Sequence, residues 1–258
     1  MLHVTQTLPA ILDPEDGPVA EVMNPGSTAP VCLVCEHASP FIPASLSNLG
    51  LASEHLQSHA VWDPGALALS RRLSEKLDAP LVACRVSRLV YDCNRPPEAP
   101  DAIPGRVEVI DIPGNQGLDA AARDMRARSV YDPFSACLSS MLDGFSHPPL
   151  MMTLHSFTPV WNGRPRATEI GLLHDDDPTL ANAMMAASDG AFDVALNMPY
   201  SATDGVTHTL QKHANPRGLK NVMVEVRNDL LKDDQAIAQV ATALLDMLIA
   251  AKVSETSA

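Results

Sequence analysis

Residues 31–43 read VCLVCEHASPFIP, an apolar run that gives way at once to polar and turn-forming residues. Pro30 precedes the run, and two prolines close it. A short apolar segment bounded in this way predicts a buried β-strand over Val31–Cys35 that ends in a loop. Glu36 and His37 follow the predicted strand directly. Because open α/β sheets bind ligands beyond the carboxyl ends of their strands, this Glu-His pair lies where a functional site is expected.

The composition indicates a globular protein with a large aliphatic core. Of the 258 residues, 46% are hydrophobic but only 4% are aromatic, so Ala, Leu, Val and Met must supply most of the core. Eighteen Lys and Arg stand against 31 Asp and Glu, a formal charge of −13. Such a surface repels phosphate backbones and anionic lipids, so we expect neither a nucleic-acid partner nor a membrane partner.

The sequence shows no sign of export. There is no charged start followed by a long apolar stretch and no run of about 18 apolar residues, so we expect neither a signal peptide nor a membrane span and predict a cytoplasmic protein. The five cysteines are odd in number and lie mostly in apolar surroundings, which predicts reduced core thiols. Cys32 and Cys35 form a C-x-x-C, but their offset of three places them on opposite faces of a strand.

Predicted strands and helices alternate along most of the chain. Residues 1–29, with four prolines among acidic residues, are expected to form an irregular arm, and residues 30–258 a single α/β domain. The patterns predict strands over residues 31–35, 80–86, 150–154, 167–173, 193–196 and 219–226, and helices from residue 53 and over residues 64–77, 118–145 (with a possible break at Pro133), 178–188 and 233–252. This alternation predicts a three-layer α/β fold, with a mixed, mostly parallel sheet and helices on both faces.

Two of the nine histidines, His37 and His155, each end a predicted apolar strand. A single buried histidine is more often a hydrogen-bonded core residue than a metal ligand. Two histidines at equivalent strand ends, accompanied by carboxylates, favour a metal site more strongly. Zinc in catalytic sites takes three protein ligands through N or O atoms and leaves one position for water, so we expect an acidic third ligand.

Asp63 and Glu36 are the candidates for the acidic ligand. Asp63 stands in the segment HAVWDPGA, just before a predicted helix. Its structural alternative is to be the N-cap of that helix and nothing more. Glu36 directly precedes His37 on an extended segment and should point to the opposite face. We therefore expect Asp63, at a helix start that faces the strand ends, to bind one divalent ion together with His37 and His155. His59 is a weaker substitute.

Three arginines, Arg88, Arg95 and Arg227, each follow a strand-like segment. Guanidinium groups bind carboxylates through two parallel hydrogen bonds, so in an acidic protein they suit a small anionic substrate. Each arginine alone could instead form a structural salt bridge. Together with Asn94, the three arginines favour an anion pocket.

Six motifs occur in order along the chain. They are EHAS followed by IP at residues 36–43, HAVWDPGA at 59–66, SRLxxDxNR at 87–95, LHSFTP at 154–159, NxPYS at 197–201 and EVRNDL at 225–230. Together they resemble the N-formylglutamate amidohydrolase family, and the resemblance covers residues 30–250. That family is in turn similar to the zinc carboxypeptidases and aspartoacylases. The resemblance implies their phosphorylase/hydrolase-like, zinc-exopeptidase-like α/β fold.

The resemblance also implies a zinc centre with a carboxylate base. It makes His37 and His155 metal ligands, and Glu225 is similar to the glutamate that serves carboxypeptidases as general base. Those relatives carry H-x-x-E for their first two ligands, whereas Pro40 stands three residues after His37 in this chain. The second ligand must therefore come from elsewhere, which supports Asp63.

The implied reaction is hydrolysis of the amide bond of an N-acyl amino acid. Zinc would activate a water, Glu225 would move its proton, and Arg88 would help to hold the oxyanion. Substrate binding is assigned to the pair Asn94-Arg95, which resembles the carboxylate grip of those enzymes, and to Arg227, Asn197 and Tyr200. The expected substrate is N-formyl-L-glutamate, which gives formate and L-glutamate in the last step of one route of histidine degradation.

Two alternatives stay open at the level of sequence. The start EHAS, in place of a P-H-S-G type of start, suggests a divergent branch of the family. An enzyme of the same fold could therefore act on another N-acyl amino acid or on a small peptide. A metal-free protein could instead use the arginine pocket to bind an acidic ligand. The sequence indicates neither the native metal nor the oligomeric state.

Overall fold

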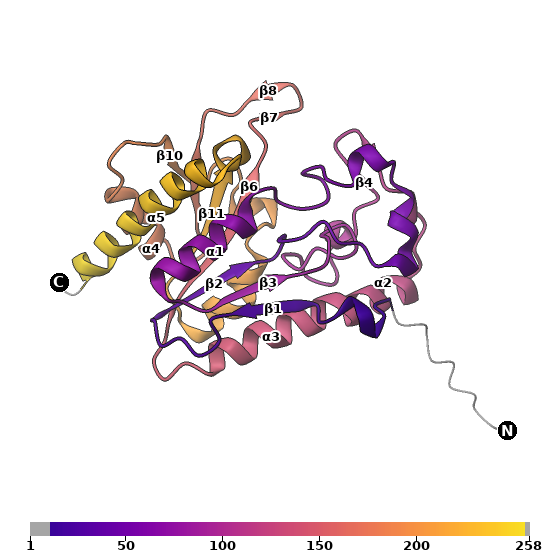
Figure 1. The fold of residues 1–258 in the computed structure, drawn as a ribbon, viewed down its shortest axis with the longest axis horizontal. Helices are drawn as coiled ribbons and strands as arrows, with labels where there is room; N and C mark the ends of the chain where they lie inside the picture. Colours follow the sequence, from indigo (N-terminus) through magenta and orange to yellow (C-terminus); the bar gives the residue numbers. More distant parts are fainter. Residues whose placement is uncertain (1–10, 256–258) are drawn as a thin grey trace.

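A mixed seven-stranded sheet forms the centre of the computed structural model, which describes residues 11–255, with side chains to residue 251 (Figure 1). The strand order is β1-β3-β2-β6-β11-β9-β10. The strands are β1 (Ala20–Met23), β2 (Val31–Cys35), β3 (Leu81–Cys84), β6 (Leu150–Phe157), β9 (Ile170–Leu173), β10 (Val194–Leu196) and β11 (Asn221–Arg227). Strands β3, β2, β6 and β11 run parallel, whereas β1 is antiparallel to β3 and β9 is antiparallel to β11. The predicted mixed, mostly parallel sheet is thus confirmed.

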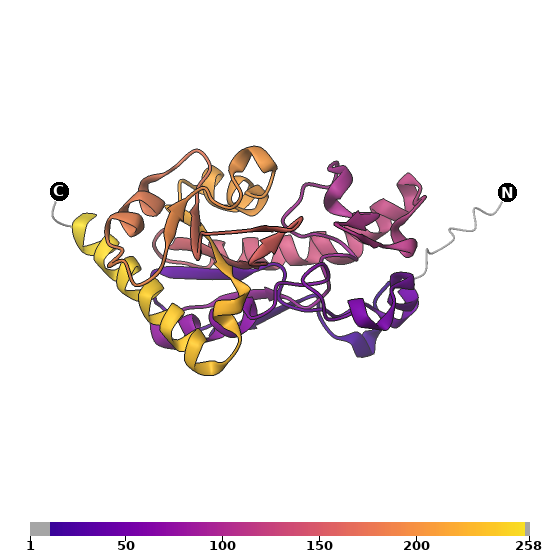
Figure 2. The ribbon, with the colours of Figure 1, turned by 90° about the horizontal axis from the view of Figure 1, so that it is seen from above.

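Helices cover both faces of this sheet (Figures 1 and 2). The helices α1 (Ala66–Leu77), α4 (Thr179–Ala186) and α5 (Asp234–Glu255) pack on one face, with α5 in contact with both others. On the other face lie α3 (Asp132–Asp143) and two π-helical turns, η6 (Ala127–Tyr131) and η8 (Leu210–Ala214), with α2 (Ala120–Arg126) leading into η6. The three-layer α/β architecture expected from the sequence is therefore present.

Shorter elements join these layers. Two small hairpins, β4 (Arg106–Val107) with β5 (Ile110–Asp111) and β7 (Val160–Trp161) with β8 (Arg164–Pro165), project from the body of the molecule (Figure 1). The 3-10 helices are η1 (Pro14–Asp16), η2 (Ala44–Gly50), η3 (Ser53–His55), η4 (Pro100–Ala102), η5 (Pro113–Asn115), η7 (Ala202–Asp204), η9 (Asn215–Arg217) and η10 (Asn228–Leu231). Most of the polar functional segments of the sequence fall in these short elements and their loops.

Strand β2 shows how the apolar run organises the core. All five of its residues are buried, and alternate residues enter different layers. Cys32 and Val34 pack in the core that contains α3, whereas Leu33 and Cys35 pack in the core that contains α1 and α5. The two cysteines therefore lie on opposite faces of the sheet, and both are free thiols, as expected.

Strand β6 and helix α3 differ from the sequence prediction. Strand β6 continues to Phe157 because its residues from Met151 to Phe157 pair with β11, so His155 lies inside the strand and not after it. Pro133 does not break its helix: it stands in the first turn of α3, where a missing N–H is tolerated. The irregularity instead falls in the π-helical turn η6 just before it.

The N-terminal segment is more regular than the irregular arm predicted over residues 1–29. Residues 1–10 lie outside the described part of the chain, but Ala20–Met23 form β1, which pairs antiparallel with β3 at the edge of the sheet. This strand of four residues lies between Pro18 and Pro25, and that setting suggested a loop. A sheet edge tolerates such a short strand because only one side of it must be paired.

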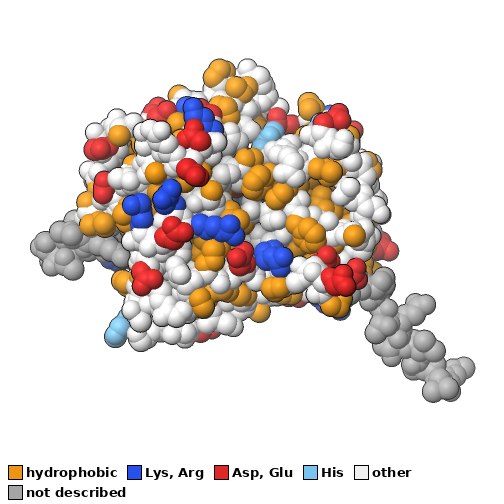
Figure 3. Space-filling model, viewed as in Figure 1, with side chains coloured by type: hydrophobic (Ala, Val, Ile, Leu, Met, Phe, Trp, Pro, Cys, Tyr) orange, Lys and Arg blue, Asp and Glu red, His pale blue; other side chains and the backbone are white. Residues whose placement is uncertain are grey.

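Helix α5 is the one described helix that is long and apolar enough to cross a membrane, by length and composition alone. One face of this helix, however, is buried in the core. Val240, Leu244 and Leu248 are buried in the cluster that α5 shares with α1 and α4. Figure 3 shows acidic side chains beside lysines and arginines across the face that carries α1 and α5. Helix α5 thus packs one face on the sheet and leaves the opposite face, including Ile249, exposed.

Candidate metal centre and active site

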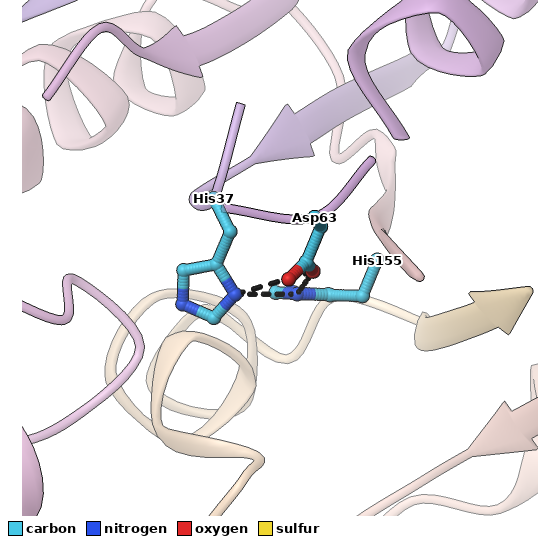
Figure 4. A group of neighbouring side chains, drawn as sticks. All are labelled: His37, Asp63 and His155. Carbon is cyan, nitrogen blue, oxygen red and sulfur yellow. Dashed lines mark hydrogen bonds and ion pairs between the residues drawn. The ribbon is translucent and has the colours of Figure 1, made fainter. Parts of the chain in front are cut away.

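His37, Asp63 and His155 converge beyond the carboxyl end of β2 (Figure 4). His37 Nδ1 lies 3.3 Å from Asp63 Oδ2 and 3.1 Å from His155 Nδ1. His155 Nδ1 lies 3.1 Å from the same Asp63 oxygen, and all three side chains are buried. His59, the substitute considered above, instead contacts Glu108. The structure thus brings together the three side chains that the sequence analysis selected.

The spacing of the three converging atoms fits a metal ion. Zinc bonds of about 2.0–2.1 Å in tetrahedral geometry place neighbouring ligand atoms about 3.3 Å apart, close to the separations in this triangle. At most one proton fits between two imidazole nitrogens that face each other at this distance, and a carboxylate oxygen brings only negative charge. A cation among the three atoms would satisfy all of them at once. This donor set of two nitrogens and one oxygen could therefore hold one divalent ion.

The outer nitrogen of each histidine faces a buried carboxylate. His37 Nε2 lies 2.7 Å from Asp92 Oδ1. His155 Nε2 lies 3.1 Å from Glu36 Oε2, an ion-pair contact without hydrogen-bond geometry. Such carboxylates favour a proton on the outer nitrogen and leave the Nδ1 lone pairs for a metal. Glu36 thus lies outside the converging triangle. The sequence analysis missed Asp92, although this residue is the conspicuous acid of the SRLxxDxNR motif.

Arg88 bridges two aspartates of the site. Its Nη1 donates to Asp63 Oδ1 at 3.2 Å, and its Nη2 donates to Asp92 Oδ2 at 3.0 Å. Burial alone would raise the pKa of both carboxyls, but the neighbouring His37 and Arg88 hold each pKa below its usual range. Both aspartates are therefore ionised at neutral pH. The role of Arg88 at an oxyanion stays a prediction.

Glu225 stands beside the converging triangle on the neighbouring strand. The parallel pairing of β11 with β6 puts Glu225 in register with His155. Glu225 is buried, and its Oε2 has no hydrogen-bond partner among the described residues. Burial raises the pKa of Glu225 to about 7, although His155 opposes the rise. A buried carboxyl without a partner is costly, so its retention here suits a proton-transfer group.

Asn94 and Arg95 are engaged with the surrounding loops. Asn94 donates through its side-chain amide to the carbonyl of Val206 and accepts from the backbone N–H of Thr209 at 3.0 Å. Arg95 Nε donates to Asp101 Oδ2 at 2.8 Å, and most of the Arg95 side chain is buried. These contacts tie the loop after β3 to the segment before η8. The proposed contact of this pair with a substrate stays a prediction.

Arg227 is held by acids other than Glu225. Its Nη2 lies 3.2 Å from Glu169 Oε1, and its Nε donates to Asp229 Oδ1 at 2.8 Å. The salt bridge between Glu225 and Arg227 that would have explained Glu225 structurally is thus absent from the described ion pairs. Its absence leaves Glu225 available for chemistry.

Asn197 and Tyr200 follow β10. The Asn197 side chain accepts from the backbone N–H of His174 at 3.1 Å, which links the ends of β9 and β10. The hydroxyl of Tyr200 accepts a hydrogen bond from Arg166 Nη2 at 3.1 Å. Burial and the nearby Glu225 carboxylate raise the pKa of Tyr200. Contacts of Asn197 and Tyr200 with a substrate stay predictions.

The site combines a place for a divalent cation with a buried carboxyl that has a nearly neutral pKa. A cation can activate a water and polarise a carbonyl, and a carboxylate with such a pKa can take and return a proton. These are the functions needed to hydrolyse an unactivated amide.

Comparisons with known proteins agree with this chemistry. Residues 29–232, which contain all the site residues above, match the family model for N-formylglutamate amidohydrolase. The chain is similar to the crystal structure of a gene product from Agrobacterium tumefaciens, with 48% identity, a TM-score of 0.93, and coverage of 95% of this chain and 99% of that one. It shares the fold of the N-formylglutamate amidohydrolase from Ralstonia eutropha JMP134, with 20% identity, a TM-score of 0.70 and coverage of 93% and 99%. The comparison with curated proteins gives no match.

Proposed function

The chain belongs to the N-formylglutamate amidohydrolase family and is an amidohydrolase, and from this premise we propose that it hydrolyses N-formyl-L-glutamate to formate and L-glutamate with one divalent metal ion, most simply zinc. The observation that carries the proposal is the convergence of His37, Asp63 and His155 beside the unpartnered carboxyl of Glu225. Neither feature serves packing, because burying these polar groups is costly.

The converging side chains would hold the metal ion through His37 Nδ1, His155 Nδ1 and Asp63 Oδ2. When bound, the ion supplies Lewis acidity, which lowers the pKa of a water and polarises the acyl carbonyl. Asp92 orients the His37 ring through Nε2, and Arg88 holds both Asp92 and Asp63 in place. The protein thereby presents three fixed donor atoms before any substrate arrives.

Glu225 is the general base in this proposal. It takes a proton from the attacking water as the oxygen adds to the formyl carbon. It then returns that proton to the nitrogen as the C–N bond breaks, so that formate and the free amine of glutamate leave. A pKa of about 7 is close to the value at which one group performs both transfers well at neutral pH.

The anionic substrate needs cationic groups in a chain of net charge −13. We retain Arg95, with its neighbour Asn94, as the proposed grip on the α-carboxylate, and Arg88 as the proposed donor to the oxyanion. Arg227, Asn197 and Tyr200 complete the proposed surroundings of the substrate. The reaction would place the protein in histidine degradation in the cytoplasm, and both of these assignments rest on the substrate.

A substrate panel tests the proposed function. Protein purified without chelator and loaded with one equivalent of zinc is assayed with N-formyl-L-glutamate, N-acetyl-L-glutamate, other N-formyl amino acids and small dipeptides. Formate released from the N-formyl compounds is measured by coupled reduction of NAD. Hydrolysis of N-acetyl-L-glutamate and of the dipeptides is measured by the appearance of free amino groups. We expect the highest kcat/KM with N-formyl-L-glutamate.

Other outcomes of the panel point elsewhere. A higher kcat/KM for an N-acetyl compound or a dipeptide would assign the same machinery to that substrate. If no substrate turned over and acidic amino acids bound equally well without metal, the protein would be a binding protein.

A further inference from the structure

Arg166 lies in a cage of three aromatic rings. Its guanidinium carbon is 5.3 Å from the ring centroid of Phe157, 5.0 Å from that of Trp161 and 4.9 Å from that of Tyr200. Its Nη2 donates to the Tyr200 hydroxyl at 3.1 Å, and its Nη1 donates to the carbonyl of Thr158 at 3.4 Å. Contacts of this kind hold a guanidinium in position without neutralising its charge.

No carboxylate pairs with Arg166 within residues 11–251. The three arginines proposed above for the site, Arg88, Arg95 and Arg227, each have an aspartate or glutamate partner. Arg166 differs from these three in that no carboxylate among the described residues compensates its charge, although the chain has 31 acidic and 18 basic residues. The aromatic cage therefore preserves a cation that can bind an anion from outside the chain.

The cage adjoins the metal centre along β6. His155 and Phe157 are two residues apart on this strand, so their side chains point to the same face and their Cα atoms lie about 6–7 Å apart. Burial raises the pKa of Tyr200, and the Glu225 carboxylate lies close enough to add to this rise. The hairpin β7–β8, which ends just before Arg166, projects beyond the carboxyl end of β6 (Figure 1). Arg166 is thus a neighbour of the proposed reaction centre.

We propose that Arg166 binds the side-chain carboxylate of the substrate and so determines the preference for an acidic side chain. The inference rests on the proposed function and deepens it. The side-chain carboxylate of N-formyl-L-glutamate lies further from the scissile amide than the α-carboxylate does. Arg166 packs beside Phe157, two residues beyond His155, and so lies outside the triangle of His37, Asp63 and His155. The half-buried Trp161 ring also offers apolar surface to the methylene groups of a glutamate side chain.

The inference is tested by substrate preference in matched variants. Zinc-loaded wild type, Arg166→Gln and Arg164→Gln are assayed with N-formyl-L-glutamate and N-formyl-L-glutamine, which differ only in the side-chain carboxylate. Arg164 is an exposed arginine on the same hairpin, with no acidic partner among the described ion pairs, so Arg164→Gln is the control. Thermal unfolding of each variant confirms that it is folded.

We expect wild type and Arg164→Gln to prefer N-formyl-L-glutamate by about 100-fold or more in kcat/KM. The side-chain amide of N-formyl-L-glutamine cannot form the charged bidentate pair with Arg166 that the carboxylate forms. In Arg166→Gln the preference should fall to within a few-fold, mainly through a higher KM for N-formyl-L-glutamate. Arg166→Lys keeps the charge without the planar fork and should retain part of the preference. If Arg166→Gln slowed both substrates equally and kept the preference, its role would be structural and the inference would be overturned.

Binding of the products separates this inference from the proposed reaction. Calorimetry with L-glutamate and L-glutamine requires no turnover. A preference for L-glutamate that disappears in Arg166→Gln supports the inference even if N-formyl-L-glutamate is not hydrolysed, in which case only the proposed function fails. Hydrolysis of N-formyl-L-glutamate together with an unchanged preference in Arg166→Gln overturns the inference and leaves the proposed function intact. Absence of any preference in wild type overturns the inference as well.

Discussion

Glu225→Gln keeps the size of the side chain but removes its charge and its capacity to take a proton. Burial raises the pKa of Glu225 from 4.5 to about 7 in the metal-free protein. At about 1.4 kcal/mol for each unit of pKa, this rise corresponds to about 3 kcal/mol of lost stability for the charged form. Because the folded protein holds the proton more tightly than the unfolded chain, the loss is absent below about pH 4.5 and complete above about pH 7.

The variant should therefore be more stable and less active than wild type. In metal-free protein at pH 8, Glu225→Gln should raise the free energy of unfolding by about 1–3 kcal/mol and Tm by about 2–10 °C. The gain should vanish toward pH 4.5. In zinc-loaded protein the gain should shrink, because a nearby divalent cation stabilises the wild-type carboxylate. The kcat for N-formyl-L-glutamate should fall by a factor of about 10² to 10⁴.

Scanning calorimetry in the presence of a chelator, at pH 5 and pH 8, measures the stability, and steady-state formate release from zinc-loaded protein measures kcat. Glu169→Gln is the matched control, because Glu169 is ion-paired with Arg227 and its neutral variant should gain no stability at pH 8. A metal-free Glu225→Gln that is less stable than wild type at pH 8 would show that the carboxylate has a structural partner. Loss of zinc from the variant would make Glu225 a ligand, and an unchanged kcat would refute its role as base.

Three further predictions follow from the same site. Asp92→Asn removes the carboxylate that orients His37 and should weaken zinc binding by about 10–100-fold, measured by competition with a chromogenic chelator; unchanged affinity would remove Asp92 from the metal centre. Arg95→Lys loses the bidentate fork and should lower kcat/KM for N-formyl-L-glutamate by about 10-fold or more; an unchanged value would place Arg95 outside the substrate site. As the pH is lowered, kcat/KM should fall because Glu225 becomes protonated. The apparent pKa of this fall should be at or below about 7, because bound zinc lowers the pKa of Glu225 from its metal-free value. In Glu225→Gln this fall of kcat/KM at low pH should be absent.

The fold was predictable wherever pattern and burial agree. The run Val31–Cys35 is buried on both faces and bounded by prolines, and it forms β2 as expected. The parallel order of the sheet follows from the alternation of strands and helices. The strand β1 was not predictable, because its four half-buried residues carry little hydrophobic signal and are stabilised by pairing with β3, which is a long-range contact.

The site was predictable where its residues end or follow strands. His37 directly follows β2, His155 lies two residues before the end of β6, and the predicted helix start at Asp63 pointed to the third donor. The carboxylate on His37 was not predictable, because any of several acids in the loops could have faced its outer nitrogen and only the tertiary fold selects Asp92.

The unpaired state of Arg166 was likewise hidden from the sequence. Its cage is assembled from β6, the β7–β8 hairpin and the loop after β10, which are brought together only by folding. The sequence placed Arg227 just after a strand, whereas it is the last residue of β11, and its acidic partners Glu169 and Asp229 could be seen only in three dimensions.

The most direct test of the account is a zinc titration of chelator-stripped protein, with formate release from N-formyl-L-glutamate as the readout. The account predicts negligible activity without metal and a linear rise that stops at one zinc per chain. In His155→Ala, which lacks one donor atom of the triangle, the same titration should give no such rise while the protein stays folded. Full activity in the stripped wild-type protein, or an unchanged titration curve in His155→Ala, would contradict the account.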